Sequence, residues 1–336
     1  MTILLAVIVF GVLILVHELG HFLAAKKAGI KVEEFSIGLG PAIGQFRRGE
    51  TLYSLRLLPL GGYNKMAGWD TGEWDDPRGF NRQPLRWRMG VIGAGSAMNF
   101  VLALALFIFV FMVLGIPSDK SVIGKVVPGL PAAAAGIQPG DRVLAIEGVK
   151  VNTWREMVEQ IYSRPEQEIS LVIERAGQKR EITLRTARDL RSGVGIIGVE
   201  PRWERQGLLR SIALGIQQTV AITTLILASL IQMLTGQIAP EVVGPVGIVQ
   251  LVGQAASFGL ANVLNFIAVL SVDLGIINLF PIPALDGSRL VFLAIEGIRG
   301  RPIDPEKENI IHFIGFALLM ALLLFITYKD ILRLIG

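Results

Sequence analysis

The first 27 residues, MTILLAVIVFGVLILVHELGHFLAAKK (1–27), are apolar, and Glu18 is the only acidic or basic residue before Lys26. About 20 such residues suffice for a helix to cross hydrocarbon, so the stretch predicts a membrane span. On this helix His17 and His21 lie one turn apart and can bind one Zn²⁺, with Glu18 beside them as general base. Ionisable groups at bilayer depth are costly and mark functional sites. The pattern therefore predicts peptide-bond hydrolysis inside a membrane.

The alternative for HELGH is a satisfied polar cluster packed between helices. It would explain burial of the histidines. It would not explain why two of the three histidines in the chain flank a glutamate at metal-binding spacing.

The composition excludes an ordinary soluble protein. The chain is 52% hydrophobic and 18% charged, with a mean hydropathy of +0.56. Its net charge of +4 does not indicate nucleic-acid binding, because the basic residues gather beside apolar segments. The absence of cysteine removes disulfides, cysteine-ligated zinc and thiol catalysis.

The predicted fold is a polytopic α-helical membrane protein with about four spans, a membrane-associated β-hairpin and an inserted α+β domain. The segments are a first span at 1–25, a hairpin and interfacial loop at 26–88, a second span at 89–117, the inserted domain at 118–201, an amphipathic or re-entrant segment with linker at 202–260, a third span at 261–288, a loop at 289–309 and a last span at 310–328. His312 opens the last span and is predicted to be interfacial rather than a fourth metal ligand.

Charge asymmetry sets the predicted orientation. Lys26, Lys27 and Lys31 follow the first span, whereas a cleaved signal peptide carries its positive charge before the apolar core. The positive-inside rule then places Met1 and the inserted domain outside and 26–88 in the cytoplasm.

Asp286, the predicted third zinc ligand discussed below, must reach the membrane depth of HELGH. With the inserted domain outside, a full crossing by 208–236 would leave Asp286 near the outer face. We therefore predict that 208–236 lies on or dips into the outer side of the membrane rather than crossing it. The absence of Lys and Arg from 236–262 agrees with this placement.

The stretch 32–63 is rich in glycine and short apolar runs, which favours strands and turns. A hairpin here would offer an open edge at 51–60, including Leu55 and Leu57, to an extended substrate segment. A plain loop with membrane-facing apolar residues is the alternative. In the second span, Asn99 either contacts the active site or makes a helix–helix hydrogen bond.

The inserted segment contains short β-rich runs, an amphipathic helix at 152–163 and a hairpin near 176–178. Its order of strand, short alanine helix, PGD turn, strand, helix and hairpin resembles a bacterial PDZ domain, through GLPA (129–132), AGI (135–137) and PGDRVL (139–144). PDZ domains bind peptide ends by strand addition. The alternative is a domain that only shields or spaces.

The stretch NLFPIPALDG (278–287) contains two prolines that break a regular helix. Asp286, at the end of this break, is the predicted third zinc ligand. With His17 and His21 it would leave a fourth tetrahedral position for water, as a catalytic site requires. The alternative is that Asp286 only caps the next helix.

Over nearly its whole length the chain resembles the site-2 protease family of intramembrane zinc metalloproteases, in the branch of the regulator of sigma-E protease and in a short form with one PDZ domain. The resemblance rests on HELGH (17–21), FSIGLGP (35–41), LPLGGY (58–63), Gly95 to Asn99, GPVGI (244–248) and INLFPIPALDG (277–287).

The resemblance implies that His17, His21 and Asp286 bind Zn²⁺ and that Glu18 is the catalytic base. It implies that Asn278 and Pro281 help to hold the substrate strand. The expected location is a bacterial cytoplasmic membrane. Asp273 stands where relatives are expected to have Asn; it lies 13 residues before Asp286 and is not predicted to be a ligand.

The expected substrates are single-span membrane proteins, such as anti-sigma factors or remnant signal peptides, already trimmed by another protease. The PDZ domain would filter them by size or by a newly exposed C-terminus. Two alternatives are an inactive membrane-tethered PDZ adaptor, which has no reason to keep HELGH and LDG, and a metal transporter, which would show several ligand sets.

Overall fold

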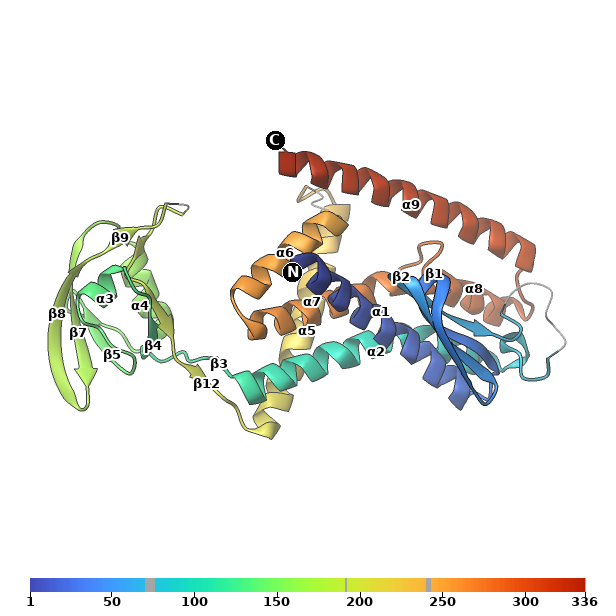
Figure 1. Cartoon of the computed structure of the whole chain (residues 1–336), viewed down its shortest axis with the longest axis horizontal. Helices are drawn as coiled ribbons and strands as arrows, with labels where there is room; N and C mark the ends of the chain where they lie inside the picture. Colours follow the sequence, from blue (N-terminus) through green and yellow to red (C-terminus); the bar gives the residue numbers. More distant parts are fainter. Residues whose placement is uncertain (70–75, 191, 240–242, 336) are drawn as a thin grey trace. The chain divides into compact units, whose positions relative to one another are not determined.

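The computed structural model describes residues 1–69, 76–190, 192–239 and 243–335. The chain divides into two compact units, Met1–Ile108 with Ile212–Gly336, and Phe109–Ser211 (Figure 1). Parts of the predicted interfacial loop (70–75) and linker (240–242) lie outside the described residues.

The unit Phe109–Ser211 contains the inserted α+β domain, with the element order predicted above. Its elements are β3 (Ile116–Pro117), β4 (Ile123–Val126), α3 (Pro131–Ala134), β5 (Arg142–Ile146), β6 (Val149–Lys150), α4 (Trp154–Tyr162), β7 (Glu168–Arg175), β8 (Gln178–Arg185), β9 (Ala187–Arg188), β10 (Gly195–Ile196), β11 (Val199–Pro201) and β12 (Trp203–Glu204). Strands β6, β5, β7 and β8 form one antiparallel sheet in that order.

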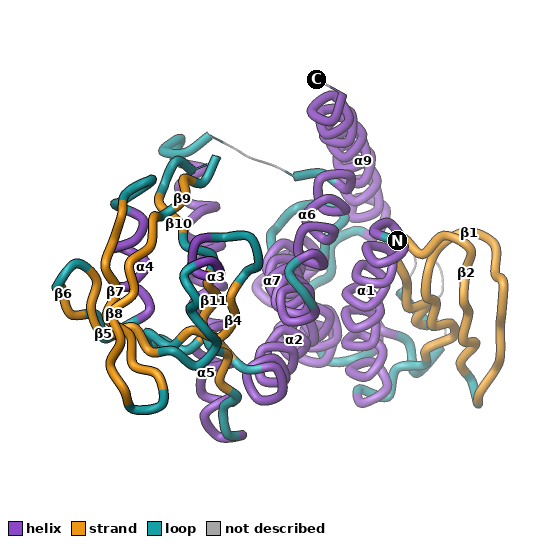
Figure 2. Tube along the Cα trace, turned by 60° about the vertical axis from the view of Figure 1, so that its left-hand side comes forward, coloured by secondary structure: helices purple, strands orange, loops and turns teal. Residues whose placement is uncertain are grey.

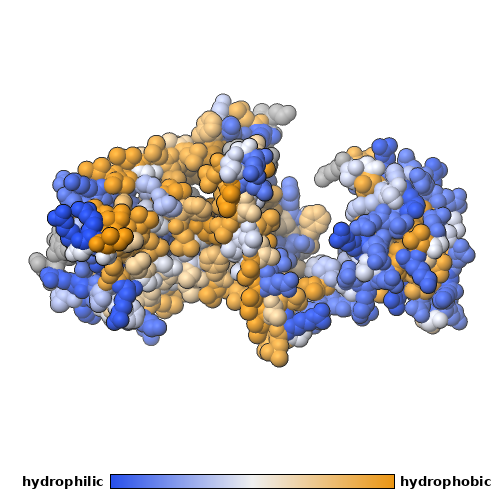
Figure 3. All heavy atoms as spheres, turned by 180° about the vertical axis from the view of Figure 1, so that it is seen from behind, coloured by the Kyte–Doolittle hydropathy of each residue, from blue (hydrophilic) through white to orange (hydrophobic). Residues whose placement is uncertain are grey.

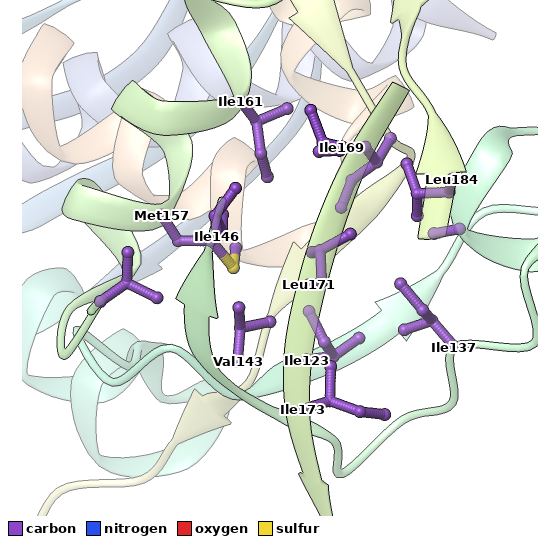
Figure 4. Close-up of a cluster of buried hydrophobic side chains, with 13 residues drawn as sticks. Ile123, Ile137, Val143, Ile146, Met157, Ile161, Ile169, Leu171, Ile173 and Leu184 are labelled. Atoms are coloured by element: carbon purple, nitrogen blue, oxygen red, sulfur yellow. The ribbon is translucent and has the colours of Figure 1, made fainter. Parts of the chain in front are cut away.

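A separate apolar core holds this domain together. Met157 and Ile161 of α4 face alternate residues of β7, Ile169, Leu171 and Ile173, and all five are buried (Figure 4). Residues two apart on a strand share a face, and residues four apart on a helix do the same, so the two patterns meet in one layer. Thr153 begins α4 with a capping box to Glu156.

Asp141 of the PGD turn ties this turn to β7. Its carboxylate accepts hydrogen bonds of 2.7 Å from Nε and Nη2 of Arg175 and one of 2.8 Å from the backbone N–H of Gln138. Burial opposes ionisation, but Arg175 and the Gln138 N–H outweigh it and hold the pKa of Asp141 below its usual value.

The other unit is helical, with a hairpin. Its elements are α1 (Thr2–Lys27), β1 (Val32–Arg48), β2 (Thr51–Met66), a 3₁₀ turn (Phe80–Arg82), α2 (Leu85–Phe109), α5 (Leu208–Leu234), α6 (Pro245–Ser257), α7 (Leu260–Leu279), α8 (Asp286–Arg299) and α9 (Pro305–Ile335); α5 begins in the last residues of the other unit, and a π-helical turn (Val110–Leu114) follows α2. Apolar residues cover much of this unit, whereas polar residues dominate the surface of the inserted domain (Figure 3).

Within the described residues, five helices are long and apolar enough to cross a membrane: Thr2–Lys27, Leu85–Leu114, Leu208–Leu234, Leu260–Leu279 and Glu306–Arg333. The chain is thus a multi-pass helical protein, and the sequence prediction of about four spans omitted Leu208–Leu234. At about 1.5 Å per residue α5 is roughly 40 Å long and could cross. However, α5 runs across the direction of α2 and α9 in Figure 1 rather than alongside them.

The contacts of α6, the helix that follows α5, agree with an α5 that does not cross the membrane. Gly253 of α6 lies against Thr2 at the start of α1, and Asp330 near the end of α9 accepts a 2.9 Å hydrogen bond from Gly247 N–H. Helix α6 therefore lies at the end of the helical unit where α1 begins. The prediction that 208–236 does not cross remains open to test.

The two strands of the hairpin, β1 and β2, fold into a sheet. Its two central segments are the first part of β1 (34–37) and the first part of β2 (52–55). Residues 34–37 of β1 pair with 52–55 of β2 on one side and with 62–65 on the other, and 52–56 also pair with 42–47. The segment 62–66 is therefore an edge strand, and it lies beside α1 (Figure 2). The far part of the hairpin exposes large apolar side chains, namely Leu39, Ile43, Phe46, Leu55, Leu57 and Leu58.

The predicted third span, 261–288, divides into two helices. Helix α7 ends at Leu279, and α8 starts at Asp286 after the proline-containing break. The break therefore lies inside the predicted span, as Pro281 and Pro283 indicated.

Cysteine labelling tests the orientation of α5, because the natural chain has no cysteine. Arg205→Cys and Gln237→Cys flank α5, and both are expected to react with an impermeant maleimide from the outer side of oriented vesicles. Lys307→Cys, in the predicted cytoplasmic loop, is the control and should react only from the other side. Reaction of Gln237→Cys from the cytoplasmic side alone would show that α5 crosses.

Acid unfolding tests the role of Asp141 in a fragment spanning 116–205. Asp141→Asn should lower the free energy of unfolding at pH 7 by about 2–4 kcal/mol, because it leaves Arg175 without its anionic partner. The folded pKa of Asp141 is depressed, so its contribution is present above the unfolded pKa of about 3.9 and is lost as pH falls through the folded pKa. In urea titrations the difference between the two proteins should therefore shrink as the pH falls below about 3.9; a constant difference from pH 7 to pH 2 would contradict this account.

Candidate active site

Three donor atoms converge between α1 and α8. Nε2 of His17 and Nε2 of His21 lie 3.1 and 3.2 Å from Oδ2 of Asp286, and 3.1 Å from each other. The two histidines are buried and the Asp286 side chain is 18% exposed. Among the described residues this is the one group of three or more metal-ligand side chains with donors gathered within 4.8 Å.

Helix α1 positions both imidazoles, because residues four apart lie on one helix face. The ring of His21 is fixed from behind, since its Nδ1 lies 2.8 Å from the backbone oxygen of Val91 in α2 and donates to it. In a neutral His21 this leaves Nε2, which faces Asp286, free to bind a metal. On His17, Nδ1 lies 3.2 Å from the side-chain amide of Asn99.

Glycines allow α2 to come this close. A Cβ on Gly95 would overlap Nε2 of His21 and come within 2.7 Å of Cε1 of His17. A Cβ on Gly20 would overlap the carbonyl oxygen of Ala94. No other residue type fits either position without displacing an imidazole or a helix.

The break before α8 delivers Asp286. Ala284 adopts a φ of +77°, a left-handed conformation that is unfavourable for a residue with a Cβ. Its backbone N–H donates to Nδ1 of His312 in α9 at 3.1 Å, which ties the turn in place. A Cβ on Gly287 would overlap the carbonyl oxygens of Leu279 and Phe280, so this glycine permits the tight entry into α8.

A buried ion pair fixes the other end of α8. Arg88 of α2 donates to both carboxylate oxygens of Glu296, with a 2.9 Å bond from Nη1 to Oε2, and its Nε donates to the Gln83 carbonyl at 3.1 Å. Two-point contact of guanidinium and carboxylate restrains both distance and direction. Helix α2 therefore supports both histidines and α8.

A cavity of about 380 Å³ opens beside the three donors. Glu18 lies in its wall, next to the histidines, together with the edge-strand residues Gly61, Gly62 and Asn64. Asn278 also lines it.

The other predicted substrate contacts lie elsewhere. Asn99 is fully buried behind His17, and its backbone carbonyl accepts a 2.7 Å hydrogen bond from Ser271 of α7, so it combines the two alternatives given for it. Pro281, Leu55 and Leu57 are not among the residues that line the cavity. The expected open edge at 51–60 is wrong for 52–55, because these residues pair on both sides.

Sequence reasoning missed three contributors. Asn64 contacts Glu18, Val91 contacts His21 through its backbone, and His312 supports the turn before Asp286. A backbone acceptor leaves no signal in side-chain chemistry. His312 was expected to be interfacial, and its role depends on a contact 28 residues away in the chain.

The donor set fits a zinc ion. A zinc ion about 2.0–2.1 Å from each of three tetrahedral donors would separate those donors by about 3.3–3.4 Å, close to the 3.1–3.2 Å observed. Oδ2 of Asp286 is buried and has no hydrogen-bond partner among the described residues, although both imidazoles approach it. Two imidazoles and one carboxylate, beside an open cavity, are typical of catalytic rather than structural zinc.

The apolar helices and this donor set define a membrane metallopeptidase. Comparisons with a protein family, with individual relatives and with solved structures identify the class more closely. The family model "Peptidase family M50" matches residues 5–322. Zinc metalloprotease RasP of Geobacillus kaustophilus is 36% identical over 97% of this chain and 96% of its own, and the regulator of sigma-W protease RasP of Bacillus subtilis is 33% identical over 99% of each.

Among solved structures, the PDZ domain of the SdrC-like protein from Listeria monocytogenes covers 25% of this chain and 88% of its own, at 18% identity and a TM-score of 0.23. The family match and the relatives each extend over nearly the full chain. The chain belongs to peptidase family M50, the site-2 proteases, and is a zinc metalloprotease. The family favours an enzyme over the adaptor and transporter alternatives.

Replacing Gly95 by Ala should disrupt the metal centre, because the new methyl group occupies the space of the imidazoles. Zinc affinity should fall by at least about 10–100-fold, the cost of disturbing groups that support metal ligands. The measurement is zinc content of purified protein after dialysis against a weak chelator. Gly93→Ala is the matched control, since nothing lies within 4 Å of a Cβ there. Wild-type zinc content in Gly95→Ala would contradict this geometry.

Proposed function

We propose that this protein cleaves the transmembrane segments of single-span membrane proteins in regulated intramembrane proteolysis, with His17, His21 and Asp286 as zinc ligands. The supporting observation is the convergence of these three donors, with Glu18 in the wall of the adjoining cavity, between helices apolar enough to span a bilayer. The bound zinc acidifies a water molecule and polarises the scissile carbonyl.

Glu18 is the proposed general base and acid. It takes the proton as water attacks the peptide carbonyl and returns it to the departing amine. Glu18 does not share the helix face of His17 and His21, because consecutive residues on a helix point in different directions. Its carboxylate therefore faces the cavity beside the donors rather than completing the ligand set.

Asn99 is proposed to fix the tautomer of His17. If its amide presents Oδ1, this oxygen accepts from Nδ1–H of His17 and leaves Nε2 free for zinc. The same orientation provides a partner for Oδ1 of Asn99, which otherwise has none among the described residues. Val91 does the same for His21 through its carbonyl.

The substrate is proposed to unwind and add as a strand to the edge at 61–64. Gly62, Tyr63 and Asn64 pair with β1 on one side only, and all four residues line the cavity. An exposed strand edge binds an extended peptide through backbone hydrogen bonds, which suits substrates of varied sequence. Asn278 of α7, which also lines the cavity, would contribute an amide, and Pro281 would act only through the shape of the break.

The PDZ-like domain is proposed to lie outside the cytoplasmic membrane of a bacterium and to select substrates already trimmed by another protease. Trp154 and Met157 of α4 and Ile196 and Val199 of β10–β11 line an apolar groove of about 280 Å³. A groove between a strand and a helix can receive a peptide end by strand addition. One curated relative is named a regulator of sigma-W protease, which fits a substrate of the anti-sigma type.

Glu18→Gln tests the base. The variant should keep wild-type zinc content, because the ligand atoms are untouched, and should lose about 10²–10⁴-fold in turnover. Cleavage of a model single-span substrate in detergent is measured together with zinc content. Asp286→Asn should lose both zinc and cleavage.

Asp273→Asn is the matched control for Asp286→Asn, since it changes the same group in α7 outside the donor cluster. It should keep its zinc. Cleavage by Glu18→Gln at the wild-type rate would remove Glu18 from the mechanism, and full zinc content in Asp286→Asn would remove Asp286 from the ligand set.

A further inference from the structure

Asn64 of β2 makes a two-point contact with Glu18. Its Nδ2 donates to Oε2 of the Glu18 carboxylate at 2.7 Å and to the Glu18 backbone oxygen at 2.9 Å. We propose that Asn64 is a positioning residue that holds the Glu18 carboxylate in the orientation needed for proton transfer. This inference rests on the proposed function, in which Glu18 is the base.

The chemistry of the contact fixes the orientation of the amide. The Glu18 carbonyl is an acceptor only, and so is the Glu18 carboxylate in the ionised form that a general base requires. An NH₂ group carries two hydrogens and satisfies both, whereas the amide oxygen would repel both. The contact thus depends on a residue with two donors on one atom, which Asn supplies at this distance and Ser, Val or Asp does not.

The edge strand brings Asn64 within reach of α1. Asn64 pairs with Phe35 in the sheet, and Gly62 with Ile37. At Gly62 a Cβ would lie 3.0 Å from Cγ of Glu18 and 2.8 Å from the Ser36 carbonyl oxygen, so a side chain there would push the strand away from α1. The glycine before Tyr63 therefore sets the distance that the Asn64 contact requires.

The two-point contact distinguishes the two carboxylate oxygens of Glu18. Oε2 is engaged by Asn64, which leaves Oε1 as the oxygen that receives the proton from water. The bond to the Glu18 backbone oxygen anchors Asn64 to the same residue, so the carboxylate is held relative to its own helix turn. A free glutamate side chain would lose this preorganisation to rotamer motion.

Asn64→Leu removes both donors at similar volume. We expect kcat to fall by about 10–100-fold, since a hydrogen bond to a charged group and the placement of a general base are both affected. KM and zinc content should stay within about twofold of wild type, because neither the ligands nor the strand pairing changes. Gln45→Leu is the matched control: it removes another side-chain amide, bonded to Ser54 within the same sheet, and should leave kcat unchanged.

A double-mutant cycle with Glu18→Asp separates positioning from a structural effect. The shorter carboxylate of Glu18→Asp no longer reaches the amide, so adding Asn64→Leu should lower kcat by less than about twofold further. All four proteins are assayed as full chains in detergent, with the same single-span substrate and zinc measured alongside.

Three outcomes would overturn the inference: a wild-type kcat in Asn64→Leu, equal losses of kcat and zinc content, or the same loss in the Glu18→Asp background as alone. Each leaves the proposed function intact as long as the wild type holds zinc and cleaves. Failure of the proposed function shows differently, as a wild type that holds zinc and does not cut any membrane substrate, or that holds none.

Discussion

Two imidazoles and a carboxylate meet within about 3 Å between largely apolar helices. Groups of this kind lose their hydration when they leave water, so they remain there only if other interactions offset that loss. A bound cation offsets it most directly, because all three donors face one point. The rest of the helical unit holds α1 and α8 in the positions at which their three donor atoms face this point.

Helix α2 carries most of this support. Its residues contact both histidines through Val91 and Asn99, approach them through Gly95, and hold α8 through the Arg88–Glu296 pair. Arg88, Val91, Gly95 and Asn99 follow one another at intervals of about one turn along α2, so a single rigid element relates both ligand-bearing helices. A displacement of α2 would therefore disturb both histidines directly and Asp286 through α8.

The parts of this arrangement that follow from local pattern were predictable. HELGH encodes its own geometry through the helical repeat, and the prolines before Asp286 predict the break in the third span. The inserted domain shows the same alternation of strand and helix in sequence and structure. The parts that depend on pairing between distant segments were not predictable: the edge at 61–64 arises because β1 pairs with two parts of β2, and a single sequence does not specify that register. The contact of His312 with Ala284 has the same origin.

In the proposed function, the edge strand serves two requirements of a peptidase that cleaves membrane helices. An extended substrate needs unpaired backbone groups beside the metal, and the general base needs a fixed carboxylate at the same place. One segment of β2 is positioned for both, because Gly61 and Gly62 bring its backbone to the cavity and Asn64 contacts Glu18 three residues after the first glycine. Strand alternation sends Tyr63 to the opposite face of the sheet, where its hydroxyl accepts a hydrogen bond from Arg56, itself paired with Glu34. The polar cluster of Tyr63, Arg56 and Glu34 therefore stabilises the strand beside the cavity, which Tyr63 also lines, and disturbing it would alter the proposed substrate alignment and base placement together.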